Sequence, residues 1–336
     1  MLTLQALHSS NPVKGDVQIL HVQISELKVG QTAALKPYLG LTIADSTGQH
    51  EVKIWSEAQA FSAAQAIGSG NFVELTSSFS VNSYGLNLHD PSVRVLTDEE
   101  RETLLAGSPE AVATAQAEWA EALAAVESMQ SVPLKKLCTA LLQHKGVAPA
   151  YRRAAAANKN HHARRGGLLS HSVAMLRSVR ALAPLYGANI DLLSAGALFH
   201  DLGKVSENDV ADGFAVLLSN PGELCGHIMV GAEIVNAVWR EVVAADPEMA
   251  KENLTRLHLL HLIASHHGTK EFGSPVVPKT PEAMILHFVD TLDASLEMMR
   301  MSYEVNDSPA PGFIEGGWPL KRTLLPPLPM VGAQQF

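Results

Sequence analysis

The stretch Asp191-Leu-Leu-Ser-Ala-Gly-Ala-Leu-Phe-His200-Asp201-Leu-Gly-Lys204 carries the pattern around which the rest of the chain is interpreted. Its apolar residues predict a helix that ends at the His-Asp pair, with Gly203 expected as the glycine that stops the helix. An imidazole and a carboxylate are both ligands for divalent metal ions, and the C-terminal end of a helix favours a cation. Lys204 is then placed to meet an anion that the metal attracts. For this stretch alone, an ordinary polar helix end is the alternative.

Length and composition limit what the chain can be. Its 336 residues suffice for about two domains, and 46% hydrophobic with 18% charged residues excludes global disorder. Two cysteines exclude a disulfide framework and a Cys-rich zinc site, which suits a reducing compartment. The first residues lack the pattern of a signal peptide, and no apolar run reaches about 18 residues, so we expect a cytoplasmic protein without a membrane span. A net charge of −9 argues against coating of duplex nucleic acid, but permits a local basic path for a single strand.

The first 100 residues predict a small β-barrel. Apolar residues alternate with others over residues 38–44 and 52–55, and residues 45–48 between them have turn composition. Further short strands are expected at residues 71–76, 84–88 and 92–96, and residues 56–66 resemble a short helix. About five strands with one interposed helix suit a Greek-key barrel of the OB type.

Three side chains of this barrel are candidates for nucleic-acid contact. If the apolar face of the hairpin at residues 38–55 points inward, then Tyr38, Lys53 and Trp55 point outward. Exposed aromatic rings with a nearby cation can stack bases and meet a phosphate. The alternative is that these rings pack under a loop or against the next domain.

From residue 97 the pattern becomes helical, and residues 151–165 invert the acidic balance of the chain. This segment holds five cations and no acidic residue: Arg152, Arg153, Lys159, Arg164 and Arg165, with His161 and His162 among them. A solvated surface explains such a segment as well as a phosphate-facing lip does. The lip is of interest because the chain then leads directly to His171.

Several predicted helices each carry a histidine or aspartate on or near an apolar face. His171 shares a helix face with Leu168 and Met175, and the 29 residues to His200 allow one helix to turn back beside another. The further candidates downstream are His227, His266, His267, Asp290 and Asp293. A lone histidine on such a face is usually a core residue, but the repeated placement favours a common site.

In order and spacing, His171, the His200-Asp201 pair and Asp290 resemble the H…HD…D signature of HD-domain metal-dependent phosphohydrolases. The additional histidines resemble the versions that hold two metal ions. With the N-terminal OB-type barrel and the motifs at residues 161–171, 265–275 and 287–293, the chain is similar to the YhaM family of 3′–5′ exoribonucleases up to about residue 305.

This resemblance implies a multidomain α+β architecture: an OB-fold over residues 1–100, a helical connector over 101–145, an all-α HD domain over 146–305 and a Pro-rich tail over 306–336. It also implies two divalent metal ions, with manganese as the first choice and iron, cobalt, nickel or magnesium as alternatives. Asp201 would bridge the ions and act with Lys204 in catalysis. The other implied ligands are His171, His200 and Asp290 for one ion, and His227 with His266, His267 or both for the other. Asp293 would orient a ligand rather than bind an ion.

The resemblance further implies hydrolysis of single-stranded RNA, and of single-stranded DNA as a second substrate. Arg164, Arg165 and His162 would bind the strand at the metal site, and the barrel would deliver it. Two alternatives stay open. The first is an HD phosphohydrolase of nucleotides or cyclic dinucleotides in which the barrel serves regulation or oligomerisation. The second is a nucleic-acid-binding protein whose HD site is vestigial. The sequence leaves the oligomeric state open, including a homo-oligomer.

Overall fold

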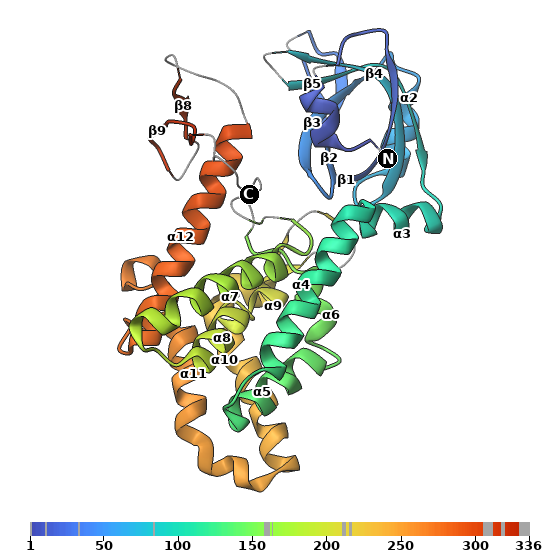
Figure 1. The fold of residues 1–336 in the computed structure, drawn as a ribbon. Coiled ribbons are helices and arrows are strands. Elements are labelled where there is room, and N and C mark those ends of the chain that lie inside the picture. The colour runs from blue at the N-terminus through green and yellow to red at the C-terminus, as the bar shows by residue number, and fades with distance from the viewer. Residues whose placement is uncertain are drawn as a thin grey trace.

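The computed structural model describes residues 2–10, 12–32, 34–82, 85–157, 162, 164–209, 213–214, 217–304, 312–316 and 320–328. Lys159, His161 and most of the tail expected at residues 306–336 lie outside this range. Figure 1 shows a barrel of the first strands above a bundle of helices, with α4 descending from the barrel into the bundle. Over the described residues, no helix combines the length and apolar character needed to cross a membrane.

The five-stranded barrel confirms the expected fold of the N-terminal region. Its antiparallel strands pair in the order β3-β2-β1-β4-β5, and β3 packs against β5 to close the sheet. Leu39 and Leu41 of β2 and Val52 and Ile54 of β3 are buried, as their alternation predicts. The elements of this region are α1 (Leu4–Ser9), β1 (Val17–Gln31), β2 (Pro37–Asp45), β3 (Gly48–Trp55), α2 (Ala60–Ile67), β4 (Phe72–Asn82) and β5 (Gly85–Val95).

Two details of the barrel differ from the sequence expectation. Helix α2 begins at Ala60, four residues later than expected, because residues 56–59 form turns. The two short runs expected at residues 84–88 and 92–96 belong to one strand, β5, with a register shift where it pairs with β4 near Ser78. Tyr84 lies outside the described residues.

Apart from two pairs of two-residue strands, the described residues after β5 form helices and their connections, which confirms the expected helical region. Thr97 and Glu100 form a capping box at the start of α3, and Ser108 caps α4 with Pro109 in its first turn. The helices and short strands are α3 (Asp98–Ala106), α4 (Pro109–Glu127), α5 (Val132–Gln143), α6 (Ala148–Arg153), α7 (Gly167–Tyr186), α8 (Ile190–Phe199), α9 (Lys204–Glu207), β6 (Asn208–Asp209), β7 (Leu217–Leu218), α10 (Asn220–Ala245), α11 (Asn253–Ser265), α12 (Pro281–Glu304), β8 (Ile314–Glu315) and β9 (Thr323–Leu324). Two 3₁₀ segments, Pro247–Glu252 and Lys270–Phe272, complete the set.

The prediction that Gly203 is the glycine that stops the helix is wrong, because α8 ends at Phe199 and Gly203 directly precedes α9. The φ of Gly203 is −63°, an ordinary right-handed value. Glycine is needed there because a Cβ atom would lie 1.9 Å from the carbonyl oxygen of His227 and 2.6 Å from the nitrogen of Gly231. This contact brings α10 against the segment that follows α8, and it carries His227 toward the His200-Asp201 pair.

A small apolar cluster joins the barrel to the helical region. Phe214, between β6 and β7, is 7% exposed and packs with buried residues of the barrel and α3. Its ring lies 6.3 Å from that of Phe72 in an edge-on arrangement. The backbone N–H of Phe214 also donates to Oε1 of Gln23 in β1 at 2.8 Å.

Candidate metal centre

One group of ligand atoms forms where α7, α8 and α12 meet. His171 on α7 and His200 at the end of α8 are fully buried, and their Nε2 atoms lie 3.2 Å apart. Oδ1 of Asp290 on α12 lies 3.3 Å from the His171 Nε2 and 3.9 Å from the His200 Nε2. These three residues have the donor atoms and the proximity for one metal ion.

A second group forms on the other side of Asp201. Nε2 of His227 and Nε2 of His266 lie 3.4 Å and 3.5 Å from Asp201 Oδ1. All three atoms are buried and have no hydrogen-bond partner among the described residues. The ring of His267 lies 5.1 Å from that of His227, and His267 shares a ligand-atom cluster with His227 and His266.

Asp201 faces both groups. Its Oδ1 points to His227 and His266, whereas its Oδ2 lies 3.4 Å from the Nε2 of His200 and 3.8 Å from that of His171. A carboxylate that directs one oxygen to each group has the geometry of a bridge between two ions. Lys204 is also placed here, because its Nζ lies 2.6 Å from Asp201 Oδ2.

The outer nitrogen of each histidine in the centre has an acceptor of its own. When the Nδ1–H donates outward, a neutral ring presents the Nε2 lone pair inward, as metal-ligating histidines usually do. The Nδ1 contacts are His171 with Asp293 at 2.7 Å, His200 with the carbonyl of Ala197 at 3.1 Å, His227 with Glu207 at 3.1 Å, His266 with the carbonyl of Ile263 at 2.8 Å, and His267 with the carbonyl of Phe272 at 2.8 Å.

The electrostatics of the centre favour a cation. Burial lowers the pKa of His171, but hydrogen bonds to Asp290 and Asp293 outweigh it and raise that pKa to about 9. Although burial alone would raise the pKa of Asp201, Lys204 and His200 hold it well below its usual range. Burial lowers the pKa of His266, and burial with the neighbouring histidines lowers that of His267 to about 4. The carboxylates are therefore ionised and these two rings neutral, the forms that bind metal.

The donor set fits divalent first-row ions. Within each ligand-atom cluster of the centre, the ligand atoms lie within 4.8 Å of one another, as required of atoms that each approach one ion at about 2.0–2.2 Å. Three buried atoms, Oδ1 of Asp201 and the Nε2 atoms of His227 and His266, have no hydrogen-bond partner among the described residues, and a cation between them would satisfy all three. Nitrogen and oxygen ligands without a thiolate suit Mn²⁺, Fe²⁺ and similar ions.

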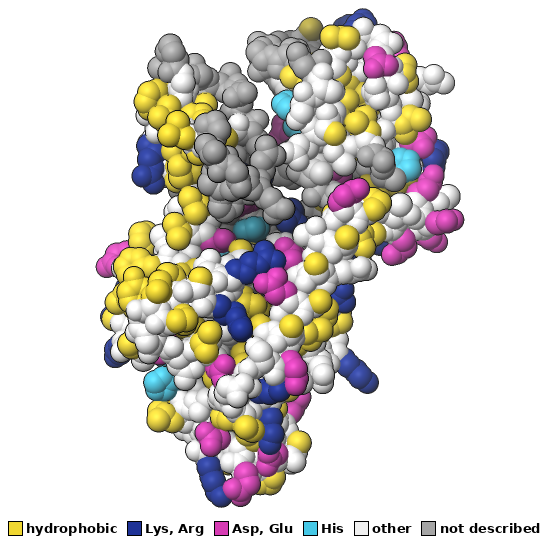
Figure 2. Space-filling view, in the orientation of Figure 1, with side chains coloured by type: hydrophobic (Ala, Val, Ile, Leu, Met, Phe, Trp, Pro, Cys, Tyr) yellow, Lys and Arg dark blue, Asp and Glu magenta, His cyan; other side chains and the backbone are white. Residues whose placement is uncertain are grey.

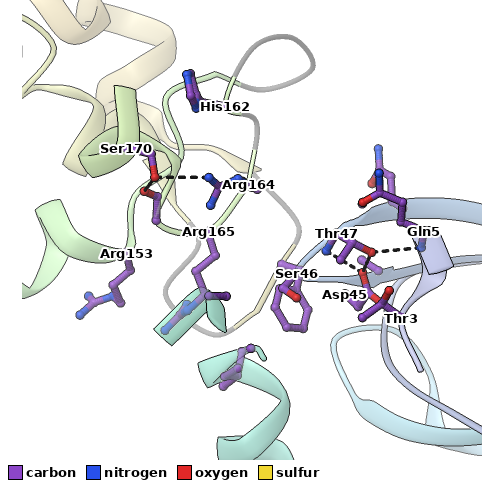
Figure 3. A pocket seen from close by; sticks show the side chains of 18 of the residues that line it. Thr3, Gln5, Asp45, Ser46, Thr47, Arg153, His162, Arg164, Arg165 and Ser170 are labelled. Atoms are coloured by element: carbon purple, nitrogen blue, oxygen red, sulfur yellow. Dashed lines mark hydrogen bonds between the residues drawn. The ribbon is translucent and has the colours of Figure 1, made fainter. Parts of the chain in front are cut away.

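A cleft of about 1570 Å³ lies between the barrel and the helical region, and the basic lip forms one of its walls. Figure 3 shows Arg153, Arg164 and Arg165 with His162 on this side and the turn of the β2–β3 hairpin on the other. In Figure 2, Lys and Arg side chains are scattered over this face of the molecule, and some of them lie where the helical region meets the barrel. His162 joins the cleft to the metal centre, because its Nε2 lies 3.4 Å from Oδ2 of Asp293.

The lip residues also hold the fold together. Arg164 donates to Oγ of Ser170 at 3.3 Å, and Arg165 donates to the carbonyl of Gly213 at 3.5 Å. His162 has a φ of +52°, an uncommon value for a residue with a side chain. Its carbonyl oxygen would be 2.0 Å from a Cβ at Gly167, so the glycine allows this close approach.

The outward orientation expected for three barrel residues is confirmed, but they lie away from the cleft wall. Trp55 is 42% exposed, its ring centroid is 5.5 Å from that of Tyr38, and Nζ of Lys53 lies 5.2 Å from the Tyr38 centroid. None of the three lines the cleft. Most of the barrel residues that do line it surround the other end of the same hairpin: Thr42, Ala44, Asp45, Ser46, Thr47, Gly48, Gln49, His50 and Glu51.

Sequence reasoning missed Glu207. Its carboxylate lies 3.1 Å from Nδ1 of His227 and accepts the backbone N–H of His227 at 3.3 Å. That N–H is free to donate because α10 is broken at Gly226, whose φ is 69°. Glu207 lies six residues after Asp201 in a four-residue helix, and no periodic pattern marks it. The glycine directly before His227 was the available signal.

Comparison with known proteins places these features in a family. The family model described as the HD domain matches residues 168–295. A relative from Listeria welshimeri, the 3′–5′ exoribonuclease YhaM, is 31% identical over 290 residues that cover 85% of this chain and 87% of that protein. The 3′–5′ exoribonuclease YhaM of Bacillus subtilis is 42% identical over 152 residues, 44% of this chain, and this match spans about half of the relative's length, 45%.

Among solved structures, the HD domain of the L. monocytogenes phosphodiesterase PgpH aligns with a TM-score of 0.26 and 20% identity, over 52% of this chain and 81% of that one. The sequence matches extend through both the barrel and the helical region. The chain therefore belongs to the YhaM family of 3′–5′ exoribonucleases.

Proposed function

We propose that this chain is a metal-dependent 3′–5′ exoribonuclease that hydrolyses single-stranded RNA, with single-stranded DNA as a second substrate. The observation that carries the proposal is the position of Asp201, which directs one carboxylate oxygen to each of two groups of inward-facing imidazoles. The names of the relatives supply the substrate class and the direction of degradation.

In this proposal, His171, His200 and Asp290 would hold one ion and His227 and His266 would hold the other, with His267 as a further ligand of the second ion and Asp201 as a ligand shared by both. When bound, two such ions, with manganese as the first choice, supply Lewis-acid stabilisation of the phosphoryl oxygens and lower the pKa of an attacking water. Lys204 balances the charge of Asp201 and the scissile phosphate. Arg164 and Arg165 bind phosphates upstream, and Asp293 orients both His171 and His162.

The structure of the barrel is an argument for a polymeric substrate. The register of the β2–β3 hairpin pairs Ala44 with Gln49 in the cleft and Tyr38 with Trp55 at the far end. One outward face of the hairpin thus runs from the cleft to the aromatic pair of Tyr38 and Trp55. The six residues from Gln49 to Trp55 span about 20 Å, at 3.3 Å per residue. A single strand with its 3′ end in the cleft would follow this face, and an OB fold typically covers about 4–16 nucleotides.

The division at residues 100, 145 and 305 and a cytoplasmic location belong to the same proposal. Support for the division comes from the end of β5 at Val95 and the end of α12 at Glu304. Support for the location comes from a chain with two cysteines and, within the described helices, no candidate membrane span.

A length series of substrates tests the function. RNA oligomers labelled at the 5′ end, a dinucleotide and a cyclic dinucleotide are compared at equal concentration with Mn²⁺ and after chelation. We expect kcat/KM to rise with oligomer length, products to shorten from the 3′ end, and chelation to abolish turnover. A kcat/KM that is highest for the cyclic dinucleotide would instead establish the small-molecule phosphohydrolase.

A further inference from the structure

The described residues from the end of α9 to α10 include contacts with both the metal centre and the barrel. We call the described residues Glu207 to Asp209, Gly213 to Phe214 and Leu217 to Leu218 the strap. Glu207 contacts His227 at one end of the strap, and Phe214 packs against the barrel at the other. The strands β6 and β7 between these ends pair Asn208 with Leu218.

The end of the strap at the metal centre is tightly constrained. The Asn208 side chain is buried and donates to the carbonyl of Ala155 at 3.1 Å, and the N–H of Ser219 donates to the carbonyl of Glu207 at 3.0 Å. A Cβ at Gly222 would lie 2.9 Å from Cγ of Glu207, so α10 begins directly against this carboxylate. Glu207 therefore has little freedom to move without moving the start of α10.

The barrel end of the strap is equally specific. Oε1 of Gln23 accepts the N–H of Phe214, and a Cβ at Gly213 would lie 2.1 Å from that same oxygen, so backbone and side chain are in close contact. The Phe214 ring is buried against Phe72 and Leu104. Arg165 of the basic lip donates to the carbonyl of Gly213.

We propose that the docked barrel, acting through the strap and Glu207, holds His227 in position for the second metal ion. The inference rests on the proposed two-metal function. Glu207 acts as a positioning residue: it fixes the Nδ1 tautomer and the backbone of His227, so that Nε2 points to Asp201 Oδ1. Loss of such an outer hydrogen bond to a metal ligand typically weakens metal binding about 10–100-fold.

Titration with Mn²⁺ tests the proposal, with free Mn²⁺ followed by electron paramagnetic resonance. Metal-free full-length wild type, Glu207→Gln, Phe214→Ala and the double variant are compared. Phe61→Ala is the matched control, because Phe61 packs partly buried against the barrel core away from the strap. Phe214→Leu, which keeps the apolar burial, distinguishes lost docking from lost folding, and thermal unfolding followed by circular dichroism reports that each variant is folded.

We expect wild type to bind two ions, and we expect Glu207→Gln to weaken the affinity for one of them about 10–100-fold. Phe214→Ala should weaken the affinity for the same ion, whereas Phe61→Ala and Phe214→Leu should leave that affinity near the wild-type value. In the double variant, Phe214→Ala should cause no further loss beyond that of Glu207→Gln, because both changes act through one contact. If wild type binds two ions but Phe214→Ala binds Mn²⁺ as tightly as wild type, or if the two changes add in the double variant, the proposed role of the strap is wrong and the two-metal function stands. Fewer than two ions in wild type would overturn the two-metal function and this inference with it.

Discussion

At the scale of single residues, the centre is defined by which atom of each side chain points inward. Every histidine there contacts an outer acceptor through Nδ1, and three of these acceptors are backbone carbonyls, which can only accept. Carbonyl acceptors fix the ring without adding charge, whereas the carboxylates of Asp293 and Glu207 add negative charge near His171 and His227. The two histidines whose Nδ1 contacts a carboxylate, His171 and His227, thus lie on opposite sides of Asp201.

Asp201 and Asp290 should differ in how many ions depend on them. Asp201→Asn keeps the shape of the side chain but removes the charge that faces both groups, so we expect the bound metal to fall from two ions per chain to none. Asp290→Asn, the matched control, alters only the group at His171 and His200, so one ion should remain. Elemental analysis after gel filtration measures both. Loss of a single ion in Asp201→Asn would make Asp201 a terminal ligand rather than a bridge.

At the scale of elements, the sequence predicted the ligands and one outer partner, Asp293, but not the other groups that hold the ligands in place. His171, His200 and Asp290 lie on long helices whose apolar periodicity marks the inward face. Gly203 was misread because a glycine near a helix end has two explanations, a left-handed φ or a close contact, and only the position of α10 distinguishes them. Glu207 depends on the same contact, so it too was invisible to a reading based on periodicity.

Gly203→Ala should therefore damage the element that carries His227. A Cβ there meets backbone atoms of His227 and Gly231, which cannot rotate away as a side chain could. Overpacking of this kind costs about 1–3 kcal/mol, and each 1 kcal/mol lowers the Tm by about 2–4 °C in a domain of 150–250 residues. Gly146→Ala is the control, because its Cβ would meet only a His144 side chain at 3.4 Å. Thermal unfolding of both variants checks the prediction, and equal Tm values would contradict it.

At the scale of the whole molecule, the sequence predicted a barrel followed by a helical region, but it did not predict how they meet. The alternation in β2 and β3 assigned inward and outward faces correctly, because a strand has a fixed two-residue period. Which end of the hairpin faces the metal centre depends on Phe214 and Gln23, residues far apart in the chain with no local pattern. As a result, the cleft forms at the turn end and the aromatic pair lies at the other end.

This arrangement predicts that Trp55 matters only for substrates long enough to reach it. Stacking on one aromatic ring contributes about 1–3 kcal/mol per base, and 1.4 kcal/mol corresponds to a factor of ten in affinity. Trp55→Ala should thus weaken binding of a single-stranded RNA of about a dozen nucleotides by about ten-fold or somewhat more, within the range of lengths that one OB fold covers. Hydrolysis of a small chromogenic phosphodiester, which occupies only the metal centre, should hardly change.

A second position on the same hairpin, Gln49, provides the control for this prediction. Gln49 lies on the same outward face as Trp55 but lines the cleft, so Gln49→Ala should weaken short and long oligomers alike. Measured over a series of RNA lengths, the ratio of wild-type to Trp55→Ala affinity should stay near one for short strands and rise once the strand spans the hairpin. A parallel loss on RNA and on the small ester would mean that Trp55 stabilises the barrel. No loss on either would mean that the nucleic-acid strand leaves the cleft along another face of the barrel than the one that carries Gln49 and Trp55.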